Sequence, residues 1–228
     1  MTELPIILDD VIDCEIQNQI EDSFFDCFFT YCNDNSLGSK TNEMKYRKFV
    51  NPLTHDVTPA FLSNILFSKN VRTYRKIYPL IKKSCDKINF KLEKIYRCYG
   101  AIHALIKKSS KIDNIHINHE IPHLVMLYYV NDCDGDTILY DKKRGDIPFT
   151  FDGYLDEYCK FNITHRISPK RGRVVFFDGA TYHSSSSPTK SIRCILTLDL
   201  FGQFMDGTYK FPEQKQEEEN NINHFDYR

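Results

Sequence analysis

The order of its hydrophobic patterns is the feature that most limits what this 228-residue chain can fold into. Apolar residues recur at every fourth position over 12–28, which predicts an amphipathic helix capped by Asp10 or Asp13. A second helical period runs over 71–88 and crosses Pro79, where we expect a kink or a new helix start. Both helical regions precede the segments that resemble strands.

Strand-like segments fill most of the second half of the chain. Each is short, rich in β-branched and aromatic residues, and bounded by turn signals such as Asp134-Gly135-Asp136. The predicted strands are 95–106, 123–130, 137–140, 173–177 and 192–200. Helices first and strands afterwards predict an α+β fold, in which the helices cover one face of an antiparallel sandwich or barrel.

Composition and charge exclude several classes of protein. Hydrophobic residues make up 41% of the chain and charged residues 27%, which excludes a disordered or collagen-like chain. The eight cysteines form no Cys-x-x-Cys pair, so a zinc finger or a disulfide scaffold is disfavoured. No apolar run approaches the roughly 20 residues of a membrane helix, and no secretory signal is evident. We therefore expect a cytoplasmic protein with no membrane partner.

The positive charge is unevenly distributed, although the net charge is only −1. Thirteen Lys or Arg residues lie between Lys69 and Lys111, against only Asp86 and Glu93. We interpret this stretch as a solvated helix face, with a surface for an anionic substrate as the alternative. Nucleic acid as a partner is neither predicted nor excluded, because no global field marks such a binder.

One set of residues has the spacing of a metal site. His116 and position 118 are two residues apart on an extended segment, so both side chains point to the same side. A distant strand end supplies His183. Two histidines and a carboxylate on one face of an octahedral metal leave three sites open, as in non-haem Fe(II) oxygenases. Ten residues later, Arg193 has the planar cation that suits the far carboxylate of a keto-acid cosubstrate.

These residues resemble the Fe(II)/2-oxoglutarate-dependent oxygenase superfamily, nearest to its prolyl-4-hydroxylase-like branch with small viral and bacterial members. The match extends over residues 114–202. Its elements are, in order, His116-Ile-Asn118, Tyr129-Val-Asn131, Gly135-Asp-Thr137, Pro169-Lys-Arg-Gly172 leading to Phe177, His183 and Arg193. The resemblance implies a double-stranded β-helix of the jelly-roll, cupin-like type, with N-terminal helices packed on the larger sheet.

The resemblance also implies the ligands and the reaction. Fe(II) would be held by the two histidines and position 118, and the cosubstrate 2-oxoglutarate by Arg193, with hydroxyl groups from Tyr128 and Thr137. Dioxygen is the other reactant, and the usual outcome is hydroxylation. The substrate stays open among a peptidyl proline, an amino acid and a nucleobase, so an anionic or peptidyl molecule is expected.

The resemblance completes the expected domain organisation. A single oxygenase-like domain covers 1–209, with helical support in 1–94 and the jelly-roll core in 95–205. The remaining 210–228 is polar, with little to bury, and we expect a peripheral C-terminal extension.

One departure from the family pattern concerns the metal. The family has Asp where this chain has Asn118, whose carbonyl oxygen can bind a metal but brings no negative charge. Asn118 could be a neutral ligand, His119 or Glu120 could replace it, or the fold could persist without oxygenase chemistry. The last alternative is a catalytically impaired jelly-roll binding protein, and a cupin-like metalloprotein without 2-oxoglutarate is a third. We expect Asn118→Asp to raise metal affinity.

Three further polar residues lie in or near predicted strands. Arg97 and His103 share one face of the strand at 95–106, and we interpret them as sheet-surface residues, with substrate contact as the alternative. His123 begins the next strand and is interpreted as a hydrogen-bonded structural residue.

Overall fold

A computed structural model gives the fold of most of the chain. It describes residues 3–27, 29–32, 60–64, 71–105, 112–113, 115–118, 122–146 and 160–207. The predicted extension at 210–228 and the alternative ligands His119 and Glu120 lie outside the described residues.

Two α-helices precede most of the strands, as predicted. Helix α1 (Cys14–Phe25) begins after Asp13, whose carboxylate accepts a hydrogen bond from the Ile16 amide at 2.9 Å. Helix α2 (Val71–Lys87) runs through Pro79 as one element, so the alternative of a new helix start there is wrong. Pro79 is partly exposed and has no amide hydrogen to donate along the helix. Neither described helix is long and apolar enough to cross a membrane.

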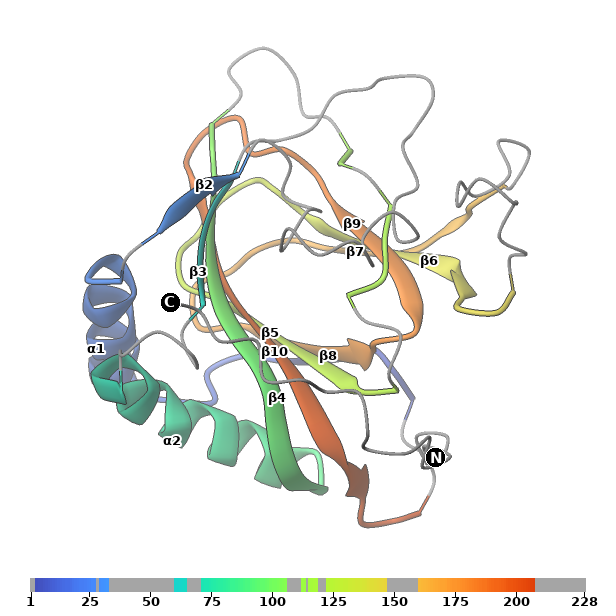
Figure 1. Cartoon of the computed structure of the whole chain (residues 1–228), viewed down its shortest axis with the longest axis horizontal. Helices are drawn as coiled ribbons and strands as arrows, with labels where there is room; N and C mark the ends of the chain where they lie inside the picture. The colour runs from blue at the N-terminus through green and yellow to red at the C-terminus, as the bar shows by residue number, and fades with distance from the viewer. Residues whose placement is uncertain are drawn as a thin grey trace, which may run out of the picture.

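Within the described segments, the strands form a seven-stranded and a three-stranded antiparallel sheet (Figure 1). Across the large sheet the order is β1 (Ile6–Leu8), β8 (Val174–Asp178), β5 (Leu124–Tyr129), β10 (Arg193–Phe204), β4 (Phe90–His103), β3 (Ala60–Asn64) and β2 (Thr30–Cys32). Across the small sheet it is β7 (Ile163–Ile167), β6 (Thr137–Lys143) and β9 (Thr181–Ser185).

The two faces of the large sheet bury different groups. Leu196 and Leu198 of β10 pack against Ile20, Phe24 and Ile77 of the helices, in what we call the helix-side core. Both helices lie on this one side of the large sheet (Figure 1). The prediction that N-terminal helices pack on the larger sheet is therefore confirmed.

The opposite face of the large sheet turns toward the small sheet. Leu127 and Val175 of the large sheet pack there with Leu139 of β6 and Ile167 of β7, forming the inter-sheet core. Because successive strand residues point to opposite faces, every second residue of β10 from Arg193 to Asp199 faces this side. The polar residues of that row lie beside the inter-sheet core.

Candidate functional site

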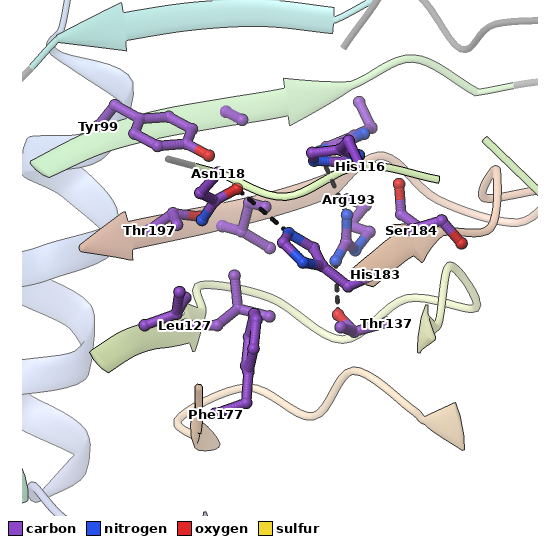
Figure 2. Close-up of a pocket in the computed structure, with 15 residues that line it drawn as sticks. Tyr99, His116, Asn118, Leu127, Thr137, Phe177, His183, Ser184, Arg193 and Thr197 are labelled. Carbon is purple, nitrogen blue, oxygen red and sulfur yellow. Dashed lines mark hydrogen bonds between the residues drawn. The ribbon is translucent and has the colours of Figure 1, made fainter. Parts of the chain in front are cut away.

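A pocket opens between the two sheets, next to the inter-sheet core (Figure 2). We call it the inter-sheet pocket. His116, Asn118 and His183 line it together with Arg193 and Thr137, so the structure brings five of the six predicted site residues to one cavity. Apolar side chains complete the wall, namely Ala101, Val125, Leu127, Phe177 and Ile195.

The two histidines meet because their backbones pair. His116 and His183 form an isolated antiparallel bridge, with each amide donating to the other's carbonyl at 2.9 Å. Their ring centroids are 4.6 Å apart. Ile115 and Ile117 are buried in a separate cluster against β6, so the alternation of the segment turns His116 and Asn118 to the pocket.

His183 faces more oxygen acceptors than it can satisfy. Its Nδ1 lies 2.9 Å from the Thr181 carbonyl oxygen, and its Nε2 lies 3.1 Å from Oδ1 of Asn118 (Figure 2). Burial and then the neighbouring His116 lower the pKa of His183 well below its usual value, so the ring is neutral near pH 7. A neutral imidazole has one N–H, and a proton on Nδ1 for Thr181 leaves a lone pair on Nε2.

Asp199, which does not line the pocket, also orients the Asn118 amide. Nδ2 of Asn118 donates to Oδ1 of Asp199 at 3.4 Å. A carboxylate only accepts hydrogen bonds, so the NH2 group faces Asp199 and the carbonyl oxygen faces His183. With the proton on Nδ1, the Nε2 lone pair of His183 faces the carbonyl oxygen of Asn118, whereas the other tautomer would donate a hydrogen bond to that oxygen.

A metal ion fits this arrangement. Octahedral ions with bonds of about 2.1 Å hold neighbouring ligand atoms about 3 Å apart, close to the separation of Nε2 and Oδ1. Metal-binding histidines commonly donate their other N–H to a backbone carbonyl, as His183 can to Thr181. The described residues hold no group of three His, Cys, Asp or Glu side chains suited to a metal.

Arg193 provides a buried positive charge in the same pocket. The side chain is only 2% exposed, and it donates to Thr137 Oγ1 at 2.8 Å and to His103 Nε2 at 3.2 Å. Burial and then Arg193 lower the pKa of His103, which keeps that ring a neutral acceptor. The Arg193 Nε–H is buried without a partner, and no carboxylate of the described chain is within ion-pair distance. Such a charge calls for an anion.

The two adjacent tyrosines of β5 take opposite faces. Tyr128, predicted to contact the cosubstrate, packs in the helix-side core and does not line the pocket. Tyr129 lies on the pocket side, where its hydroxyl is 2.6 Å from Thr137 Oγ1 and its ring centroid is 5.8 Å from the Arg193 guanidinium carbon. A shift of one residue reverses the face in a strand, so Tyr129, and not Tyr128, lies on the side of Thr137 and Arg193.

Sequence reasoning also missed three contacts around the pocket. His103 was interpreted as a sheet-surface residue but is buried against Arg193, and Arg97 pairs with the buried Asp199 at 2.7 Å. Asp199 was not considered, although its alternation with Arg193 along the same strand would have placed both on one face. His123 is buried and lies 3.5 Å from Asp199.

Comparison with known proteins finds solved structures with a similar fold. No family model matches the sequence, and no curated protein matches it. Among solved structures, an oxidoreductase of the 2OG-Fe(II) oxygenase family from Burkholderia pseudomallei is similar, with a TM-score of 0.57 and 11% identity. The similarity covers 86% of this chain and 84% of that one.

Two further structures show the same likeness. One is a prolyl hydroxylase from Trichoplax adhaerens in complex with a hypoxia inducible factor peptide, with a TM-score of 0.54, 13% identity and coverage of 86% and 83%. The other is HygX from Streptomyces hygroscopicus with nickel, 2-oxoglutarate and hygromycin B bound, with a TM-score of 0.52, 9% identity and coverage of 88% and 83%. This chain therefore has the fold of the 2-oxoglutarate-Fe(II) oxygenases.

Proposed function

We propose that the protein is a non-haem Fe(II)/2-oxoglutarate-dependent dioxygenase that hydroxylates a substrate still to be identified. The observation that carries the proposal is the pairing of two incomplete groups in one pocket. Among the described residues, Arg193 is a buried cation with no carboxylate at ion-pair distance, and Nε2 of His183 and Oδ1 of Asn118 lie 3.1 Å apart in the same pocket. A metal ion and a dicarboxylate would complete both.

The roles of the residues follow from their contacts. His116, Asn118 and His183 would hold Fe(II), and Arg193 and Thr137 the far carboxylate of 2-oxoglutarate. When bound, the iron with its cosubstrate and dioxygen supplies the oxidising power needed to hydroxylate a C–H bond. Thr181 would hold the proton of His183 on Nδ1, so that Nε2 stays available to the metal.

The neighbours of Arg193 orient its guanidinium group and leave its positive charge available to an anion. His103 and Thr137 accept hydrogen bonds from two of its nitrogens, which orients the planar guanidinium without neutralising it. Tyr129 would replace Tyr128 as the hydroxyl beside the carboxylate, through its contact with Thr137. Leu127, Phe177 and Ile195 form an apolar part of the same pocket wall.

The arrangement of the two sheets also supports the proposed domain fold. The two facing antiparallel sheets support a double-stranded β-helix, with residues 1–209 as a single domain. The structural neighbours hold unlike molecules, a peptide in one and hygromycin B in another.

The test combines binding and turnover. Calorimetry should show 2-oxoglutarate binding to the protein loaded with Mn(II), which replaces Fe(II) without redox chemistry. With Fe(II), ascorbate and dioxygen, slow conversion of 2-oxoglutarate to succinate should follow even without substrate. A protein that binds neither Mn(II) nor 2-oxoglutarate would refute the proposal.

A binding protein without turnover is the second candidate, and Asn118 is the observation that favours it. An amide lowers the negative charge on the metal ligands, which weakens the hold on a hard divalent ion. Binding of Mn(II) and 2-oxoglutarate with no succinate under any substrate tested would favour this second function.

A further inference from the structure

A buried carboxylate lies directly behind Asn118. Asp199 is fully buried on the pocket side of β10, and its Oδ1 accepts the hydrogen bond from the Asn118 amide at 3.4 Å. Its Oδ2 accepts from Nε of Arg97 at 2.7 Å, and Arg97 stands opposite it on β4. The contacts form a row from Arg97 through Asp199 and Asn118 to His183.

This row decides which way the Asn118 amide points. Without Asp199, either end of the amide could face His183, since nitrogen and oxygen have nearly the same shape. Asp199 can only accept, so it selects the orientation that directs Oδ1 at His183. Arg97 holds the other carboxylate oxygen and thereby fixes the carboxylate itself.

The contact also changes the electron density of the amide. A hydrogen bond from Nδ2 to a carboxylate draws negative charge toward Oδ1, as a carboxylate behind a metal-bound histidine makes that ligand more basic. Asn118 lacks the negative charge of an aspartate ligand. Its hydrogen bond to Asp199 restores part of that negative charge on the Asn118 carbonyl oxygen.

We infer that Asp199 is a positioning residue for the metal site, one that aims and polarises the Asn118 carbonyl oxygen. The inference rests on the proposed function, because it concerns the same metal. It makes Asn118 and Asp199 a matched pair: one amide and one carboxylate. Asp199 itself does not line the inter-sheet pocket, and its two oxygens accept from Arg97 and from the Asn118 amide.

The matched pair changes the expectation for Asn118→Asp. The variant would place two carboxylates where an amide and a carboxylate now meet at 3.4 Å. Like charges at that distance repel strongly in a buried site. The added charge still favours the metal, but the metal-free protein should become less stable, which the sequence alone did not indicate.

The experiment compares four variants by Mn(II) calorimetry and by the thermal midpoint of the metal-free protein. These are Asn118→Asp, Asp199→Asn, the double variant that exchanges the two groups, and Asn118→Ala. Asp178→Asn is the matched control, since Asp178 is also a buried carboxylate with a basic partner, Lys143 at 2.9 Å, but it lies on β8 and accepts from the Ala180 amide, whereas Asp199 accepts from Asn118.

Asp199→Asn should weaken Mn(II) binding about 10- to 100-fold, the usual effect of removing a partner behind a metal ligand. Asn118→Asp should lower the metal-free midpoint. The exchange variant should bind Mn(II) at least as tightly as the wild type and recover the midpoint lost in Asn118→Asp, because one amide and one carboxylate face each other again. Asp178→Asn should leave Mn(II) affinity within twofold.

Three results would overturn the inference. Asp199→Asn with wild-type Mn(II) affinity would show that Asp199 does not act on the metal site. Effects of the two single changes that simply add in the exchange variant would show that the residues are not paired. Retained Mn(II) binding in Asn118→Ala but not in Asp199→Asn would make Asp199 the ligand itself.

Asp199→Asn also leaves Arg97 without its ion-pair partner, which can prevent folding. Arg97→Gln with Asp199→Asn removes both charges and replaces the single variant in that case, with the same expected loss. If the wild type binds no Mn(II), the proposed function fails. The metal-free midpoints then still show whether Asn118 and Asp199 are coupled, so the two failures are distinguishable.

Discussion

The two ends of the inter-sheet pocket differ in where the charged side chain lies. At one end the charge is on the pocket wall itself, where Arg193 is supported by neutral acceptors from His103 and Thr137. At the other end the wall holds the neutral His183 ring and Asn118, and the carboxylate of Asp199 lies one contact behind them.

The difference teaches which ligand each end can accept on its own. The Arg193 end is a cation that an anion can satisfy directly. The histidine end presents lone pairs and needs a cation, but it offers little charge to hold one tightly. A dicarboxylate that reaches both would therefore strengthen the metal site, and the predictions below test each end separately and then together.

The largest effect is expected at the histidine end. His183→Ala removes a side chain that contacts both Asn118 and Thr181, so Mn(II) affinity should fall at least about 100-fold, beyond what loss of a supporting partner gives. The fold should persist, since His183 is outside the helix-side core. Metal titration with circular dichroism checks both statements. The exposed His165 of β7 gives the control, His165→Ala, and equal Mn(II) affinity in the two variants would contradict the metal site.

The next effect is expected at the Arg193 end. Arg193→Met should weaken 2-oxoglutarate binding to the Mn(II)-loaded protein by about 2 to 4 kcal/mol, because a charge-assisted pair is lost in a buried site. The ligand-free protein should melt at a higher temperature, since the variant removes a buried charge that has no carboxylate partner among the described residues. Arg166→Met, at a half-exposed arginine on β7, should change neither value. Unaltered 2-oxoglutarate affinity in Arg193→Met would assign the anion site elsewhere.

The sequence predicted elements whose patterns are local. Helix α1 and its Asp13 cap follow from a fourfold period and a capping preference, and β5 was expected at 123–130 and runs from Leu124 to Tyr129. Strand β9 was missed because its polar residues lack the apolar signal of a strand. They are buried against the pocket and β6, a setting that depends on a partner distant in sequence.

The site was predictable where spacing alone fixes geometry. The two-residue spacing of His116 and Asn118 placed both on one side, and the structure brings His183 to them through a backbone bridge. Choosing Tyr128 over Tyr129 required the absolute face of β5, which is set by its pairing with β10 and β8 and not by its own residues. Asp199 and Arg97 required the register of β10 on β4.

A smaller effect should couple the two ends. Mn(II) and 2-oxoglutarate should each bind more tightly in the presence of the other, by about 1 to 3 kcal/mol, the usual range for linked sites. The reason is that neutral ligands leave both charges of the metal available to the dicarboxylate. Calorimetry of each ligand with and without the other measures this coupling, and thermodynamic linkage requires the same factor in both directions. Independent binding would mean that the two ends belong to separate sites.

The smallest effect distinguishes the two tyrosines of β5. Tyr129→Phe removes a hydroxyl that lies 2.6 Å from Thr137 Oγ1 and donates to the Ile167 carbonyl at 3.3 Å, so 2-oxoglutarate affinity should fall by about 1 kcal/mol. Tyr128→Phe changes the same group on the opposite face, in the helix-side core, and should leave that affinity unchanged. Calorimetry on the two Mn(II)-loaded variants compares them directly. A loss confined to Tyr128→Phe would restore the prediction made from the sequence and would require β5 to present its other face to the pocket.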